Sequence, residues 1–151
     1  TEAMSMADTI VLMKDGYIVQ QSSPRELYNN PNCVYAAQFI GTPQMNVLRD
    51  VLPDGKMLGF RPEKLYFKDT GAPHIRISVR VATKEMLGSE IIYSLGSQYG
   101  THMAKTDYEM GTGEEADVCV PFSAMYLFDS NEKRIELDEK ELERIKAAFS
   151  R

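Results

Sequence analysis

Hydrophobic and polar residues alternate in different ways along the chain, and the amino-terminal part has the clearest local signal. Apolar runs at positions 10–13 and 17–19 flank the pair Asp15 and Gly16. An Asp-Gly pair between two β-favouring runs is typical of a type I′ turn, because that turn needs positive φ at both central residues. The pattern predicts a β-hairpin over residues 9–22.

Two short helices are expected next. Ser23 can cap a helix over 24–29, and Glu26, three residues further on, completes a capping-box pattern. A second helix is expected over 33–40, with Gly41 as its carboxyl-terminal stop.

Beyond Gly41 the helical period gives way to short β-like runs separated by Gly, Pro, Asp and Asn. The clearest strand is 75–81, where apolar residues alternate with polar ones and one face therefore enters a core. Further strands are expected at 47–51, 58–60, 65–67, 90–95, 101–106, 117–120 and 125–128. This pattern favours a mainly β fold, a small barrel or sandwich, with a domain boundary near Gly41.

The carboxyl end predicts one more helix. Asp138 can cap it, with Glu141 three residues later, and Leu142, Ile145 and Phe149 follow at helical spacing. Its apolar stripe is narrow, so packing on the β domain, packing on a partner and fraying in isolation all stay open.

Composition limits the classes of function. The chain has 151 residues, of which 43% are hydrophobic and 26% charged, with a formal net charge of −5. That charge disfavours nucleic acid as a partner, because a phosphate backbone needs a clustered cationic surface. Arg76 and Arg80 share one side of a strand and are interpreted as a solvated face. Cys33 and Cys119 are interpreted as small buried hydrophobes without a disulfide.

The termini and the hydropathy favour a cytoplasmic piece of a longer protein. No apolar run reaches the roughly 18 residues of a membrane span, and positions 1–8 lack the layout of a signal peptide. The sequence begins at Thr1 without an initiator Met, so we expect it to start inside a longer natural sequence.

Motifs that would carry catalysis are missing from the sequence. It has no glycine-rich loop ending in Lys-Ser or Lys-Thr, no nucleophile elbow and no His or Cys spacing suited to a metal. His74 and His102 each stand alone and are expected at the surface or on an edge strand. We therefore expect no enzyme activity, no cofactor and no metal in this chain.

Two short motifs are candidate regulatory or interface sites. Arg61 and Glu63 flank Pro62, which holds Arg61 in extended geometry, and the two charges could form an ion pair or bind an anion. Gly88 and Ser89 interrupt a long strand-like stretch, where a β-bulge or a barrel corner is the simplest interpretation.

Five segments together resemble, in order and spacing, the ATP-binding subunits of ABC importers for sugars, nearest the maltose and multiple-sugar branch. They are Glu2-Ala3-Met4-Ser5-Met6-Ala7-Asp8, Ile10-Val11-Leu12-Met13-Lys14-Asp15-Gly16, Ser23-Pro24-Arg25-Glu26-Leu27-Tyr28 with Pro31, Phe39-Ile40-Gly41-Thr42-Pro43-Gln44-Met45-Asn46, and Gly59-Phe60-Arg61-Pro62-Glu63. From Lys64 on, the pattern is similar to the regulatory domain of the oligosaccharide-binding barrel type, often called TOBE.

The resemblance implies two domains. Residues 1–41 would be the end of the ATPase domain, and residues 42–151 an OB-like TOBE domain, whose terminal helix is not a general feature of the family. The phosphate-binding loop, the acidic pair for magnesium and the signature motif would precede Thr1. The full-length parent would then use ATP and magnesium, although this chain would bind neither.

The function implied is the regulatory and dimerisation region of such a subunit. It would form a homodimer, meet membrane permease subunits through the missing ATPase domain, receive a regulatory protein of sugar metabolism, and lie peripherally on the inner face of the cell membrane. The alternative is a ligand-sensing domain that binds a small anion or sugar, lined by Arg61, Lys64, Gly88 and Ser89.

Overall fold

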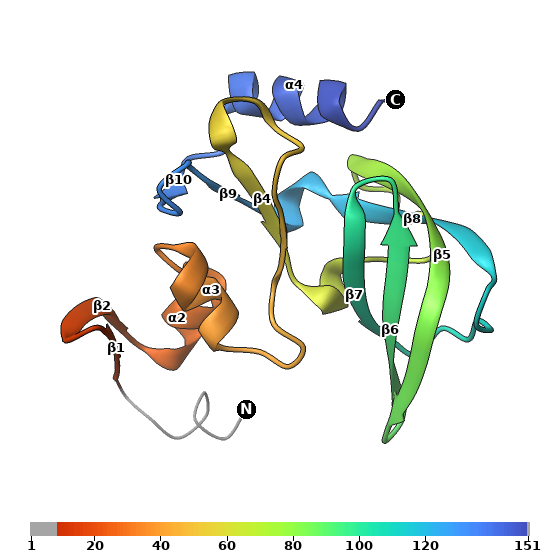
Figure 1. The fold of residues 1–151 in the computed structure, drawn as a ribbon, viewed down its shortest axis with the longest axis horizontal. Coiled ribbons are helices and arrows are strands. Elements are labelled where there is room, and N and C mark those ends of the chain that lie inside the picture. The colour runs from red at the N-terminus through yellow and green to blue at the C-terminus, as the bar shows by residue number, and fades with distance from the viewer. Residues whose placement is uncertain (1–8, 151) are drawn as a thin grey trace.

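The structure is a computed structural model that describes residues 9–150, and its amino-terminal part is a hairpin followed by two short helices (Figure 1). Strands β1 (Ile10–Lys14) and β2 (Tyr17–Ser22) pair antiparallel. Asp15 and Gly16 join them with φ of 52° and 83°, as a type I′ turn requires. The predicted hairpin is confirmed, whereas the motif at residues 2–8 lies outside the described residues.

Both predicted helices are present as α2 (Pro24–Asn29) and α3 (Val34–Phe39). The Glu26 backbone N–H donates to Ser23 Oγ at 3.1 Å, which caps α2 as expected. The Glu26 carboxylate accepts a hydrogen bond from the Asn30 side chain at 2.8 Å. Gly41 follows α3 at φ 102°, a left-handed conformation that stops the chain from continuing as a helix.

Two antiparallel four-stranded sheets make up most of the remaining chain. One has the order β10-β9-β4-β3, built from β3 (Asn46–Leu48), β4 (Met57–Phe60), β9 (Met125–Phe128) and β10 (Arg134–Ile135). The other has the order β7-β6-β5-β8, built from β5 (His74–Leu87), β6 (Glu90–Ser97), β7 (Gly100–Thr106) and β8 (Glu115–Pro121). Over residues 9–150 the sheets stay open, so the fold is mainly β but contains no closed barrel.

One apolar core is shared by these two sheets and the terminal helix. The alternating residues Ile75, Ile77, Val79 and Val81 of β5 are all buried in it, as the period of two predicts. Helix α4 (Glu139–Ala148) adds a further side chain, Ile145, which is fully buried. The helix therefore packs on the chain's own sheets, where Figure 1 shows it lying across the end of β4.

The amino-terminal end of α4 is fixed by polar contacts. Its cap is the expected one, because the Glu141 backbone N–H donates to Asp138 Oδ1 at 2.9 Å. The Glu141 carboxylate also accepts a hydrogen bond from Lys56 Nζ at 2.6 Å, and this contact lowers the pKa of Glu141. Lys56 follows the short 3₁₀ turn η1 (Pro53–Gly55), so the ion pair ties the helix to the start of β4.

Two predicted strands need correction. At 65–67 the chain leaves the 3₁₀ turn η2 (Pro62–Lys64) and makes only one isolated bridge, between Tyr66 and Cys119. The strand predicted at 47–51 ends at Leu48, because Asp50 adopts φ 62°, which no extended strand allows. A third 3₁₀ turn, η3 (Phe122–Ala124), leads directly into β9.

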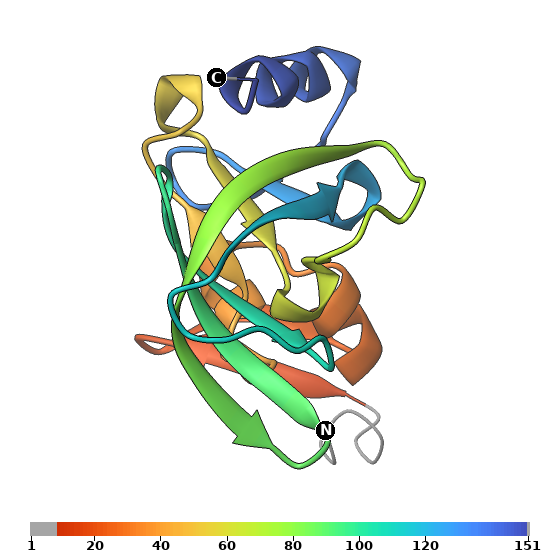
Figure 2. The ribbon, with the colours of Figure 1, turned by 90° about the vertical axis from the view of Figure 1, so that its right-hand side faces the viewer.

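The interpretation of Gly88 as a bulge or barrel corner also changes. Strand β5 runs to Leu87, and Gly88 with Ser89 forms the two-residue turn of the β5–β6 hairpin, with Leu87 paired to Glu90. Gly88 has φ 65°, which suits such a turn. The irregularity in register lies elsewhere, between Val81 and Thr83. Figure 2 shows this hairpin projecting beyond the rest of its sheet.

Both cysteines are free thiols, Cys119 buried and Cys33 half-buried. Burial raises the pKa of the Cys119 thiol.

Among the helices of residues 9–150, none combines the length and the hydrophobicity that crossing a bilayer would need.

Candidate functional site

Arg61 lies at the junction between the amino-terminal helices and the sheets. It directly follows β4, and only 2% of its surface is exposed. One terminal nitrogen, Nη1, donates to the carbonyl oxygens of Ala37 at 2.9 Å and Ile40 at 3.0 Å. The other, Nη2, donates to the carbonyl oxygen of Tyr28 at 2.8 Å.

These acceptors explain how a cation is tolerated at this depth. Tyr28 and Ala37 belong to the last turns of α2 and α3, and Ile40 caps α3, so their carbonyls lack complete intrahelical pairing. Helix carboxyl ends carry partial negative charge, which favours a cation. The Arg61 guanidinium also lies 4.2 Å from the centroid of the Tyr28 ring. Burial lowers the pKa of Arg61, but a guanidinium stays protonated.

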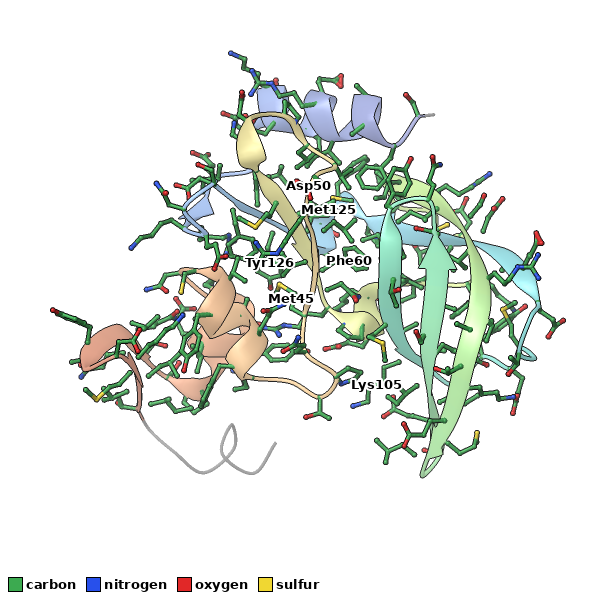
Figure 3. All side chains as sticks on the ribbon, viewed as in Figure 1. Met45, Asp50, Phe60, Lys105, Met125 and Tyr126 are labelled. Atoms are coloured by element: carbon green, nitrogen blue, oxygen red, sulfur yellow. The ribbon has the colours of Figure 1, made fainter. Side chains whose placement is uncertain are left out.

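An apolar cluster surrounds this junction. Val34 and Ala37 of α3 pack against Met45, Met57 and Phe128. Figure 3 shows Met45 and Tyr126 between α3 and β4. The sheet side of the cluster is closely packed, because an added Cβ at Gly59 in β4 would meet the Met45 sulfur at 2.7 Å. Polar and apolar contacts thus join the helices to the sheet.

The other candidate residues do not assemble around Arg61. Glu63 is half-buried and forms no ion pair with Arg61 within the described residues, whereas Lys64 is exposed. Gly88 and Ser89 lie at the β5–β6 tip, which both Figure 1 and Figure 2 show well away from η2. Because backbone carbonyls already accept hydrogen bonds from the guanidinium, the geometry at Arg61 favours a structural tie over anion binding.

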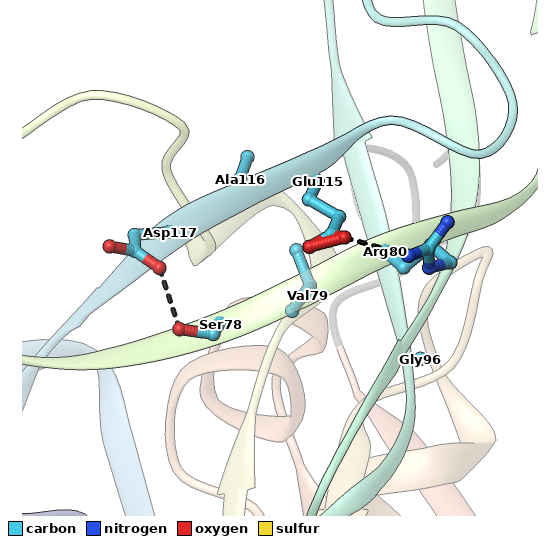
Figure 4. A pocket seen from close by; sticks show the side chains of 7 residues that line it. All are labelled: Ser78, Val79, Arg80, Gly96, Glu115, Ala116 and Asp117. Atoms are coloured by element: carbon cyan, nitrogen blue, oxygen red, sulfur yellow. Dashed lines mark hydrogen bonds and ion pairs between the residues drawn. The ribbon is translucent and has the colours of Figure 1, made fainter.

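A hollow over the β5 and β8 strands gathers charged groups but leaves them paired (Figure 4). Arg80 Nη2 donates to Glu115 Oε2 at 2.7 Å, and Ser78 Oγ donates to Asp117 Oδ1 at 2.7 Å. These side chains are exposed, which confirms the prediction of a solvated face for Arg80. Across residues 9–150, no group of three or more His, Cys, Asp or Glu side chains is arranged to hold a metal.

His102 lies on the edge strand β7, which is one of the two places predicted for it, but its side chain is fully buried. Its Nε2 is 2.6 Å from Ser97 Oγ, and its Nδ1 has no hydrogen-bond partner among residues 9–150. Burial lowers the pKa of His102 to about 4, so the ring is neutral at pH 7. The edge is covered because the Asn46 amide pairs with Met103, donating to its carbonyl at 2.9 Å and accepting from its N–H at 2.8 Å.

Import ATP-binding proteins of several bacteria match most of this chain. The chain is 32% identical over 162 residues to the sn-glycerol-3-phosphate import ATP-binding protein UgpC of Rhodopseudomonas palustris, covering 88% of this chain and 45% of that protein. It is 29% identical over 160 residues to the UgpC of Vibrio vulnificus, covering 89% of this chain and 43% of that protein. It is 29% identical over 168 residues to the oligosaccharides import ATP-binding protein MsmX of Bacillus subtilis, covering 86% and 45%.

The chain is homologous to the ATP-binding subunits of ABC importers. This confirms the resemblance drawn from the sequence motifs. The chain spans less than half the length of these importer subunits, 43% to 45%. No family model matches it.

Sequence reasoning singled out Arg61 but missed the groups that bind it. Its partners are backbone carbonyls of Tyr28, Ala37 and Ile40, and a carbonyl has no residue-type signature. The capping and stop signals at Ser23 and Gly41 do predict where helices end, and unpaired carbonyls occur at such ends. In the sequence, these helix-end signals were the only indication that backbone carbonyls could bind the Arg61 side chain.

Proposed function

We propose that this chain is the carboxyl-terminal regulatory and dimerisation region of the ATP-binding subunit of an ABC importer for sugars. In this arrangement residues 1–41 belong to the ATPase domain and residues 42–151 form the OB-like regulatory domain. The observation that carries the proposal is the match to importer subunits over 86% to 89% of the chain, within less than half of their length. The mainly β fold is compatible with it.

The Arg61 junction gives this role a physical basis. A regulatory domain acts on an ATPase domain only if displacement of one is transmitted to the other. The guanidinium and the surrounding apolar cluster hold α2 and α3 against β4, so the two parts move together. Arg61 is in this sense a positioning residue.

The proposal extends to the full-length parent. ATP and magnesium would be handled by its ATPase domain, in transport-coupled hydrolysis. That domain would contact the permease subunits, on the cytoplasmic face of the membrane. A regulatory protein of sugar metabolism would dock on the domain described here.

The β5–β6 tip is the surface we assign to contact with a second copy. Gly88 and Ser89 form its turn, and the adjoining side chains of Met86 and Leu87 are 57% and 53% exposed. Exposed apolar side chains at a hairpin tip are costly to leave in water. Met86 and Leu87 lie on opposite faces of the tip, and covering either face by the same tip of a second molecule would give an isologous contact.

Light scattering combined with sedimentation velocity on the purified chain tests this assignment. We expect a dimer at about 100 μM, near the weak end of protein association, and a monomer when Met86→Lys places a charge in the contact. Met13→Lys is the matched control, because Met13 is 53% exposed on the β1–β2 hairpin. A strictly monomeric wild-type chain, or equal loss of the dimer in both variants, would contradict the assignment.

A further inference from the structure

We infer that a hollow beside Tyr108 binds the ring of a neutral carbohydrate. The hollow is separate from the Arg61 junction and from the β5–β6 tip, and its volume is about 280 Å³. Two segments form its walls, 66–70 after η2 and 106–108 at the end of β7. The lining residues are Tyr66, Phe67, Lys68, Asp69, Thr70, Thr106, Asp107 and Tyr108.

Aromatic rings form the apolar part of the hollow. The Tyr108 ring stacks on Phe67, with 5.3 Å between centroids and 12° between planes. Phe67 in turn meets the fully buried Tyr93 edge-on at 5.6 Å. Tyr108 remains 38% exposed, and the Lys68 ammonium lies over its ring, so the stack ends in a partly open aromatic surface beside a cation. The C–H face of a pyranose ring is apolar and flat, and an aromatic surface of this kind matches it.

The backbone on both sides of the stack is held in place. Tyr93 Oη donates to the Tyr108 carbonyl at 2.6 Å and accepts from the Met110 N–H at 2.8 Å. On the opposite wall, Tyr66 exchanges backbone hydrogen bonds with Cys119 at 2.8 and 2.7 Å. A platform already ordered before binding loses little entropy when a ligand arrives.

The polar groups around the rim select for hydroxyls over anions. The carboxylates of Asp69 and Asp107 outnumber the ammonium of Lys68, whose Nζ lies 5.6 Å from the Tyr108 ring. Carboxylates accept hydrogen bonds from sugar hydroxyls, whereas they repel a phosphate or sulfate. Thr70 and Thr106 add hydroxyls that each accept a backbone N–H, from Ala72 at 3.4 Å and from Tyr108 at 3.1 Å, and can donate their own proton to a ligand. Aromatic surface with mixed donors and acceptors is the chemistry of a polyol site.

The size of the hollow restricts the ligand further. Pockets for drug-sized ligands enclose roughly 300–1,000 Å³, and this one is slightly smaller. It suits one or two sugar rings lying across Tyr108, with the rest of a longer oligosaccharide in solvent. This inference goes beyond the proposed function, since neither dimerisation nor ATPase coupling requires a ligand here.

An NMR titration of the ¹⁵N-labelled full chain with maltose tests the inference. We expect saturable amide shifts confined to residues 66–70 and 106–110, with a Kd of about 1–10 mM because the site is open. Tyr108→Ala is expected to weaken binding at least tenfold. The matched control is Tyr17→Ala, since Tyr17 is 77% exposed on the β1–β2 hairpin and is expected to leave the Kd unchanged.

Two further arms make the result decisive. Asp107→Asn changes a rim group without touching the aromatic stack, and a severalfold weaker Kd would support the site even if Tyr108→Ala fails to fold. Sodium sulfate and sn-glycerol 3-phosphate serve as anion probes. Saturable anion shifts at 66–70 and 106–110, no saturable shift with maltose, or an unchanged Kd in a folded Tyr108→Ala would overturn the inference. Oligomeric state is measured separately, so failure here leaves the proposed function standing.

Discussion

The amino-terminal segment and the two four-stranded sheets bury their apolar side chains to very different extents. In residues 9–41 the cluster centred on the hairpin and α2 has only Leu12, Leu27 and Ala36 fully enclosed, whereas the sheets and α4 share a far larger core. The hairpin also exposes large apolar side chains, among them Tyr17 at 77% and Ile18 at 58%. A small cluster does not offset the conformational entropy of ordering such a segment.

This difference indicates that residues 9–41 are held in position mainly by their contacts at the Arg61 junction. Arg61, from the sheet side, provides a charged donor to three carbonyls of the helices, and Val34 with Ala37 enters a cluster with Phe128. The main core of the sheets contains no residue of the segment, and only Met57 and Phe128 of the sheet are buried in the cluster with α3. We therefore expect a substitution at the junction to destabilise the amino-terminal helices while the sheets keep their stability.

The largest effect is expected from Arg61→Met. Removing the guanidinium leaves the carbonyls of Tyr28, Ala37 and Ile40 without their donor, at a cost of about 3 kcal/mol. Hydrogen exchange of α2 and α3 amides should accelerate by about two orders of magnitude, while β5 and β6 amides stay protected. Arg61→Lys should rescue little, because an ammonium lacks the planar fork.

Arg80→Met is the control for that variant. Arg80 is also paired, but its ion pair with Glu115 is exposed, and we expect a change below about 0.5 kcal/mol in urea unfolding. If Arg61→Met accelerated exchange equally in the helices and in β5, the one-sided dependence would be wrong.

The next largest effect is the pH dependence of the stability of the sheets, which comes from His102. His102 is neutral in the folded protein because burial lowers its pKa to about 4, against about 6.5 when unfolded. The unfolded chain therefore takes up the proton first as pH falls. The contribution of neutral His102 to the free energy of unfolding is fully present above pH 6.5 and decreases down to pH 4. By pH 5 about 2 kcal/mol of it is lost. Urea unfolding followed from pH 7.5 to pH 5 measures this loss.

A pair of histidine variants assigns the pH dependence. His102→Gln should remove most of the decrease between pH 6.5 and pH 5, although its stability at neutral pH also falls. His74→Gln is the control and should keep the decrease, because it leaves His102 and its burial unchanged. Equal pH dependence in the wild type and in His102→Gln would rule out the assignment.

A smaller effect is expected from removing a helix amino-terminal cap, which occurs both in the amino-terminal segment and in the part formed by the sheets and α4. Ser23 caps α2 and Asp138 caps α4, each through a hydrogen bond from the backbone N–H three residues later. Substitution of either by Ala should cost about 1 kcal/mol. We expect Ser23→Ala to increase exchange only within α2, and Asp138→Ala to lower the midpoint of the global urea transition. Global destabilisation by Ser23→Ala would mean that the segment and the sheets unfold as one unit.

Elements with a strong local signal were predicted well. The hairpin, both short helices, the caps at Ser23 and Asp138 and the alternating strand at 75–81 all depend on turn chemistry or periodicity within a few residues. The errors arose where long-range pairing decides. Strand β10 has only two residues and exists because it pairs with β9, and the run 65–67 has β-like composition but finds a single bridge to Cys119.

The candidate site divides in the same way. The sequence by itself determined that Arg61 is held extended before a proline, that Gly88 and Ser89 interrupt a strand, and that the chain resembles importer subunits, because these depend on residue type and order. Only the tertiary structure decided that the Arg61 charge is bound by helix-end carbonyls, that His102 on the edge strand is buried, and that Phe67 stacks on Tyr108. The physical reason is that burial and partnership depend on which distant backbone and side-chain atoms converge, and no short stretch of sequence encodes that convergence.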